Sequence, residues 1–107
     1  MMPVIELIFD RGCPHVDAAR AQLREALTLA GHGPTWTEWD RTSPSSPPHA
    51  QRYGSPSVLV GGRDVVGGEL LEGGAGCRIY YDATGARVPA PTAQMILAAL
   101  NAAAGVS

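Results

Sequence analysis

The chain has 107 residues, 45% of them hydrophobic, and a formal net charge of −2 at pH 7. This length fits a single domain over residues 1–107, and the apolar share is too high for a disordered protein. The charge gives no basic surface, so we expect no nucleic-acid partner. The sequence has neither an apolar run of membrane-spanning length nor a secretory signal, so we expect no membrane association and a cytoplasmic location.

The first third of the chain contains the main motif of the sequence. An apolar run at residues 4–9 predicts a strand that is covered on both faces. A polar turn at residues 10–12 follows, and Cys13-Pro14 then opens a long amphipathic helix with apolar residues at three- and four-residue steps. Gly31 ends this helix, so the sequence predicts a strand, a turn and a helix with a thiol at the helix start.

Cys13 occupies a position where a thiol is expected to be reactive. Backbone N–H groups at a helix N-terminus lack helical partners, and the helix dipole is positive there. Both effects favour the thiolate, which is the nucleophilic form of cysteine. Pro14 suits the first helical position, where a missing N–H costs nothing. The alternative is a buried cysteine that only packs against its neighbours.

Downstream of this helix the sequence predicts short strands, two hairpins and a terminal helix. A strand–helix–strand unit of this length implies parallel pairing of its two strands. The predicted elements are a strand at residues 35–39, a loop at 41–48, a short helix at 48–53, strands at 58–60 and 63–66 around a Gly61-Gly62 turn, a hairpin at 78–88 and a terminal helix capped by Thr92.

The order of these elements, together with three short motifs, resembles the thioredoxin superfamily. The motifs are GCPH at 12–15, SPSV at 55–58 and VLVGGRDVVGG at 58–68. The resemblance implies an α/β, thioredoxin-like fold over about residues 4–68 and 92–104. In that fold the strand after Pro56 runs antiparallel to the first strand, and the hairpin near 78–88 is an insertion.

The resemblance also implies roles for individual residues. Cys13 would be the active cysteine, and the peptide bond before Pro56 would be cis, with Pro56 facing Cys13 at a rim open to solvent. In glutaredoxins a similar hairpin ends in Gly-Gly, and the residues after it help to bind glutathione. By this likeness the substrate-binding residues are Pro14, Ser55, Pro56, Gly67 and Gly68. The implied partners are protein or small-molecule thiols and disulfides, with glutathione as a candidate co-substrate and no required cofactor.

One position departs from the common Cys-x-x-Cys motif of the superfamily. Val16 stands where the second cysteine would be, so a neighbouring thiol within this motif cannot resolve a mixed disulfide at Cys13. Three options remain open. Glutathione resolves Cys13, Cys77 resolves it, or the chemistry is not thiol–disulfide exchange. Cys77 equally well packs beneath the second hairpin without any redox role.

A more specific likeness points to soft-metal chemistry. The segments GCPH, GSPSV at 54–58 and CRIY at 77–80 resemble short bacterial proteins labelled alkylmercury-lyase-like. That likeness would make Cys13 and Cys77 ligands of Hg(II), with organomercurials as substrates and Asp10 as a proton carrier. Two thiolates suit a soft metal ion such as Hg(II). The alternative role for Asp10 is to cap the turn.

The remaining histidines complete the candidate list. A protonated His15 would favour the thiolate of Cys13, or else His15 is a solvated residue of the first helical turn. We expect His32 and His49 to be ordinary surface residues. The leading hypothesis is therefore thiol redox catalysis by Cys13, Cys77, His15 and Asp10. Its rivals are mercury handling and a non-catalytic interaction module, and the sequence indicates no oligomeric state.

Overall fold

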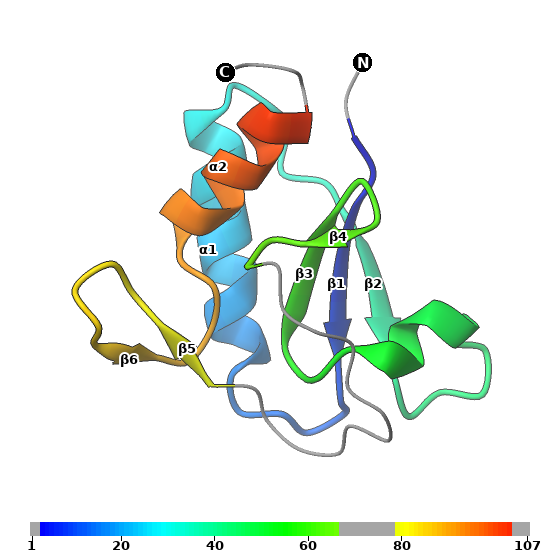
Figure 1. Cartoon of the computed structure of the whole chain (residues 1–107). Helices are drawn as coiled ribbons and strands as arrows, with labels where there is room; N and C mark the ends of the chain where they lie inside the picture. Colours follow the sequence, from blue (N-terminus) through cyan, green and yellow to red (C-terminus); the bar gives the residue numbers. More distant parts are fainter. Residues whose placement is uncertain (1–2, 67–78, 104–107) are drawn as a thin grey trace.

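The computed structural model describes residues 3–66 and 79–103, which form a mixed α/β fold (Figure 1). A four-stranded sheet and a separate two-stranded hairpin accompany two α-helices and a short 3-10 helix. The elements are β1 (Ile5–Phe9), α1 (Val16–Leu29), β2 (Thr37–Asp40), the 3-10 helix η1 (Pro48–Arg52), β3 (Ser57–Val60), β4 (Arg63–Asp64), β5 (Tyr80–Tyr81), β6 (Arg87–Val88) and α2 (Ala93–Ala103).

The four-stranded sheet has the order β2-β1-β3-β4. β1 runs parallel to β2, as the strand–helix–strand unit predicts, and antiparallel to β3, as the resemblance implies. Gly61 and Gly62 form the two-residue turn between β3 and β4, and their φ angles of 60° and 82° are those a primed hairpin turn requires. β4 is shorter than predicted, although the Val65 N–H still donates to the Val58 carbonyl at 3.0 Å.

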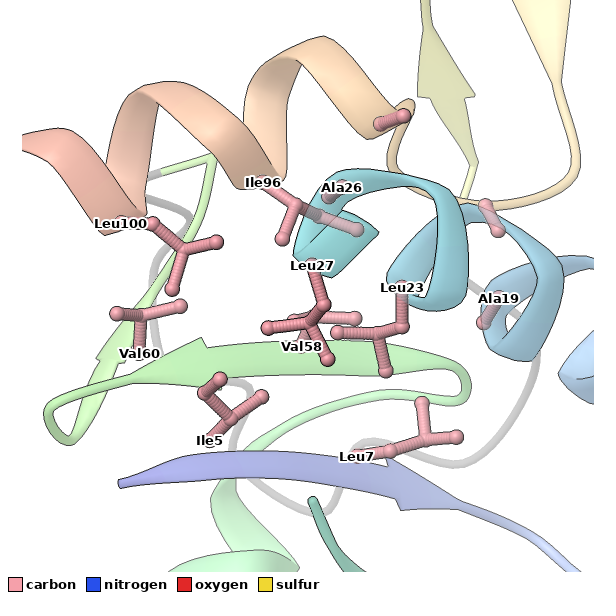
Figure 2. Packing of buried hydrophobic residues seen from close by; sticks show 12 residues of the cluster. Ile5, Leu7, Ala19, Leu23, Ala26, Leu27, Val58, Val60, Ile96 and Leu100 are labelled. Carbon is pink, nitrogen blue, oxygen red and sulfur yellow. The ribbon is translucent and has the colours of Figure 1, made fainter. Parts of the chain in front are cut away.

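The main core fills the space between the sheet and the two helices. Side chains alternate along a strand, so Ile5 and Leu7 of β1 point toward the helices while Glu6 and Ile8 point away. Figure 2 shows Leu7 and Ile5 beneath side chains of both helices. Each fully buried leucine or isoleucine contributes about 1.5–3 kcal/mol by leaving water. The core residues are Ile5, Leu7, Ala19, Leu23, Ala26, Leu27, Val58, Val60, Ala90, Ala93, Ile96 and Leu100.

The opposite face of the sheet carries a smaller apolar cluster and a buried carboxylate. η1 covers this face with Ala50, which packs with Ile8 of the sheet. Glu6 is only 8% exposed, and its Oε2 accepts a hydrogen bond from Trp39 Nε1 at 2.7 Å and lies 2.7 Å from His49 Nε2. His49 is exposed, as expected of a surface residue, but its ring also contacts this buried carboxylate, which requires hydrogen-bond donors.

The terminal helix α2 begins as the sequence predicts. The Thr92 hydroxyl accepts the Met95 N–H at 3.2 Å, which is a standard N-terminal cap. The Ala93 N–H donates to Gln22 Oε1 at 2.7 Å, so the start of α2 is also attached to α1. Within the described ranges, neither helix combines the length and apolar character that a membrane span needs.

Candidate functional site

The candidate site is centred on the turn that joins β1 to α1. The Cys13 N–H donates to the Asp10 carbonyl at 3.0 Å and closes this turn. Gly12 has a φ of 82°, a backbone conformation that glycine adopts without strain. Cys13 is partly exposed and carries a free thiol. The sequence therefore folds locally so that Cys13 lies just beyond the end of β1.

The start of α1 differs from the prediction. The helix begins at Val16, and neither Cys13 nor Pro14 belongs to it. His15 occupies the N-cap position with φ −103° and ψ 0°, and its side chain makes no capping hydrogen bond. A residue before a proline avoids helical backbone angles, which explains why Cys13 stays outside the helix. The field of the helix N-terminus, which falls off quickly with distance, therefore acts on Cys13 more weakly than we expected.

A hydrogen bond brings the two main sequence motifs together. The Asp10 N–H donates to Ser55 Oγ at 2.9 Å, although the two residues are 45 positions apart. Ile8 pairs with Ser57 in the antiparallel β1–β3 ladder, so the residues beyond the end of β1 meet those before β3. The Ser55–Pro56 peptide bond is cis, as expected. The structure thus brings Ser55 to the turn that holds Cys13.

Ser55 and Pro56 are buried, which differs from the solvent-open rim that we expected. One polar atom of each residue already has a partner within the protein. Ser55 Oγ accepts the Asp10 N–H, and the Pro56 carbonyl accepts the hydroxyl of Tyr80 at 2.5 Å. Sequence reasoning did not find Tyr80 as part of this site, because no local pattern indicates a contact between residues 24 positions apart.

Charged residues surround the turn in two pairs. Arg41 is largely buried, and its Nη1 lies 3.2 Å from the carboxylate oxygens of Asp10. The Asp10 side chain is thus ion-paired with Arg41, a contact that neither sequence-based role for Asp10 included. Arg11 Nε lies 3.5 Å from Asp40 Oδ2. Hydrogen bonds from Thr42, with a smaller effect of Arg11, hold the pKa of Asp40 below its ordinary value.

Several predicted site residues fall outside this geometry. His15 is part-buried at the start of α1. Cys77, Gly67 and Gly68 lie outside the described residues, so the Cys13–Cys77 pair, its Hg(II) alternative and the glutathione contacts of the glycines remain predictions. In residues 3–66 and 79–103, no three His, Cys, Asp or Glu side chains gather as potential metal ligands.

A shallow hollow of about 470 Å³ lies on the outer face of α1. Its lining residues are Ala21, Arg24, Glu25, Thr28 and Leu29. The residues of the Cys13 turn do not belong to this lining. The hollow is therefore separate from the Cys13 turn.

Comparison with protein-family models, curated protein sequences and solved structures finds no match for this chain.

Proposed function

We propose that this protein is a thioredoxin-like thiol–disulfide redox protein that works through Cys13. The observation that carries the proposal is the hydrogen bond from the Asp10 N–H to Ser55 Oγ. It joins the Cys-Pro and Ser-Pro motifs at one edge of the sheet, as the resemblance requires. The strand order β2-β1-β3-β4, with β3 antiparallel to its neighbours, also supports the proposal.

The proposed reaction is an exchange of disulfide partners. The Cys13 thiolate attacks one sulfur of a substrate disulfide, forms a mixed disulfide with it, and releases the other sulfur as a thiolate. Glutathione, as the second thiol, attacks the substrate sulfur of the mixed disulfide and releases Cys13 as a thiolate. Cys77, as the second thiol, instead attacks the Cys13 sulfur, releases the remaining substrate thiolate and forms a Cys13–Cys77 disulfide. In both cases one disulfide bond breaks for each one that forms, so electrons balance without a further oxidant. Glutathione or Cys77 supplies that second thiol, because Val16 replaces the usual neighbouring cysteine.

The residues around Cys13 divide into two groups by exposure. Arg11, Gly12 and Pro14 are exposed, so an incoming disulfide meets them first. Ser55 is buried and holds the turn from within through Asp10. In the proposed function Ser55 therefore fixes the position of Cys13, and it does not contact the partner directly.

The test compares wild type with Cys13→Ser and Cys77→Ser in the glutathione-dependent reduction of 2-hydroxyethyl disulfide. We expect Cys13→Ser to fall to the rate of buffer alone, because the attacking sulfur is gone. Peptide mapping by mass spectrometry should find the mixed disulfide on Cys13 in Cys77→Ser, where Cys77 cannot resolve it. A wild-type rate equal to that of Cys13→Ser would reject the proposal and favour a non-catalytic interaction module.

Cys77→Ser also identifies the second thiol. If Cys77 resolves the mixed disulfide, one equivalent of substrate disulfide releases both of its thiols from wild type but only one from Cys77→Ser. If glutathione resolves it, the two proteins release the same amount in a single turnover without glutathione.

A further inference from the structure

We propose that Tyr80 is a positioning residue for Cys13, and that the β5–β6 hairpin holds Tyr80 in place. This inference rests on the proposed function. Tyr80 is 3% exposed, and its hydroxyl donates to the Pro56 carbonyl oxygen at 2.5 Å. The hairpin lies at the same end of the molecule as the β1–α1 turn (Figure 1). An element outside the resembling part of the chain thus reaches the Ser55–Pro56 segment of the candidate site.

The position of the Pro56 carbonyl explains why this contact matters. The printed β1–β3 register runs from Ile5–Val60 to Ile8–Ser57, so Pro56 lies just beyond its end. A buried carbonyl needs a hydrogen-bond donor, and Tyr80 provides one at this point. The phenol ring is held in turn by the hairpin, where Tyr80 pairs with Val88. Tyr80 therefore fixes the chain at the residue before β3.

Three hydrogen bonds connect Tyr80 to the reactive cysteine. The Tyr80 hydroxyl binds the Pro56 carbonyl, and Pro56 is covalently joined to Ser55. Ser55 Oγ accepts the Asp10 N–H, and the Asp10 carbonyl accepts the Cys13 N–H at 3.0 Å. Loosening the first contact frees the segment that holds the turn. Such a chain of contacts requires a direct test of coupling.

The rate of disulfide exchange depends on the position of the Cys13 sulfur. The attacking sulfur has to approach in line with the sulfur–sulfur bond of the substrate, so its rate depends on where Cys13 is held. Alkylation by iodoacetamide, a small and flexible reagent, depends mainly on thiolate content and access. The ratio of the two rate constants therefore reports on position, and it is insensitive to a general loss of stability in a protein that remains folded.

The experiment measures this ratio in wild type, Tyr80→Phe and the matched control Tyr81→Phe. Tyr81 lies in the same strand but is 57% exposed. We expect Tyr80→Phe to lower the ratio by about fivefold, the rate equivalent of one neutral hydrogen bond, and Tyr81→Phe to leave it unchanged. A Tyr80→Phe ratio equal to that of Tyr81→Phe overturns the inference, while the proposed function stands if Cys13→Ser remains inactive.

Two further variants keep the inference testable if Tyr80→Phe does not fold. Gly85→Ala strains the hairpin turn, where Gly85 has a φ of 86° and no atom is close to an added methyl group. It should lower the ratio in the same direction without touching the hydroxyl. Ser55→Ala removes the hydroxyl that accepts the Asp10 N–H, which is the next hydrogen bond between Tyr80 and Cys13. If both contacts act through one path, the Gly85→Ala/Ser55→Ala double variant loses less than the product of the single effects. Independent, multiplying effects would overturn the inference.

Discussion

The two faces of the central sheet are stabilised in different ways. The helix-side face is apolar: its side chains, such as Leu7, pack in one cluster with Leu23 of α1 and Ile96 of α2. The η1-side face, which packs against η1, combines a small apolar cluster with the buried carboxylate of Glu6 and its partners Trp39 and His49. Burial of apolar area stabilises the first face, whereas the second also depends on specific donors. The helix-side face should therefore be sensitive to the loss of apolar volume, and the η1-side face to the loss of a hydrogen-bond donor.

The largest expected effect is on the helix-side face. Leu23 is fully buried, so Leu23→Ala should lower the free energy of unfolding by about 2–5 kcal/mol through lost burial and a cavity. Leu29→Ala is the matched control, because Leu29 lies in the same helix and is 62% exposed. Its effect should stay within about 0.5 kcal/mol. Urea unfolding followed by circular dichroism measures both, and equal losses would contradict the assigned core.

The next largest effect tests the donors of the η1-side face. Trp39→Phe removes the indole N–H that binds Glu6, so the buried carboxylate loses a partner at a cost of about 1–3 kcal/mol. Trp36→Phe makes the same chemical change at a part-exposed carboxylate, since Trp36 Nε1 donates to Glu38.

Water replaces the lost donor at Glu38, so Trp36→Phe should cost less than about 1 kcal/mol. Far-UV circular dichroism in urea suits both variants, because each changes the tryptophan fluorescence. If the two substitutions cost the same, Glu6 does not depend on its buried donor and the contrast between the faces is wrong.

The helix-side face was predictable because its signal is local. Apolar residues at three- and four-residue steps identify the inner surface of α1, and alternation in β1 separates Leu7 from Ile8. The parallel pairing of β1 with β2 followed from the strand–helix–strand order, and the antiparallel pairing with β3 from the thioredoxin resemblance. The partners of Glu6 were not predictable, because His49 reaches it from 43 positions away.

The candidate site shows the same limit. The prediction that the Cys-Pro and Ser-Pro motifs lie at the same edge of the sheet is correct, because strand pairing determines this placement. The predicted start of α1 at Cys13-Pro14 is wrong, because His15 is the N-cap residue and both Cys13 and Pro14 precede the helix. Sequence reasoning also missed Tyr80, whose contact with Pro56 depends on how a separate hairpin packs.

Substitution of His49 tests whether a half-exposed polar contact of the η1-side face contributes to the free energy of unfolding. The His49 side chain is 45% exposed, so water can replace part of its hydrogen bond to Glu6. We expect His49→Ala to cost about 0.5–1 kcal/mol, less than Trp39→Phe. His32→Ala is a suitable control, because His32 lies after α1, where its backbone N–H bonds to Leu27 in either variant. A larger loss for His49 than for Trp39 would reverse the order of the two donors.

The smallest expected effect is a pH dependence at the edge strand β2. A side-chain hydrogen bond from Arg20, with a further one from Trp36, holds the pKa of Glu38 below its ordinary value. A carboxylate whose pKa is lower in the folded state stabilises that state at pH values above its unfolded-state pKa. This stabilisation is lost as the pH falls through the folded-state pKa.

Glu38→Gln should therefore unfold with a flatter pH dependence than wild type as the pH falls below the ordinary pKa of a glutamate side chain. Because the pair is part-exposed, the difference from wild type should be on the order of 0.5 kcal/mol near neutral pH. Salt should reduce it further, since ions screen a surface pair. Urea unfolding at several pH values measures the slope. A slope at least as steep in Glu38→Gln as in wild type would contradict a stabilising contact between Glu38 and Arg20.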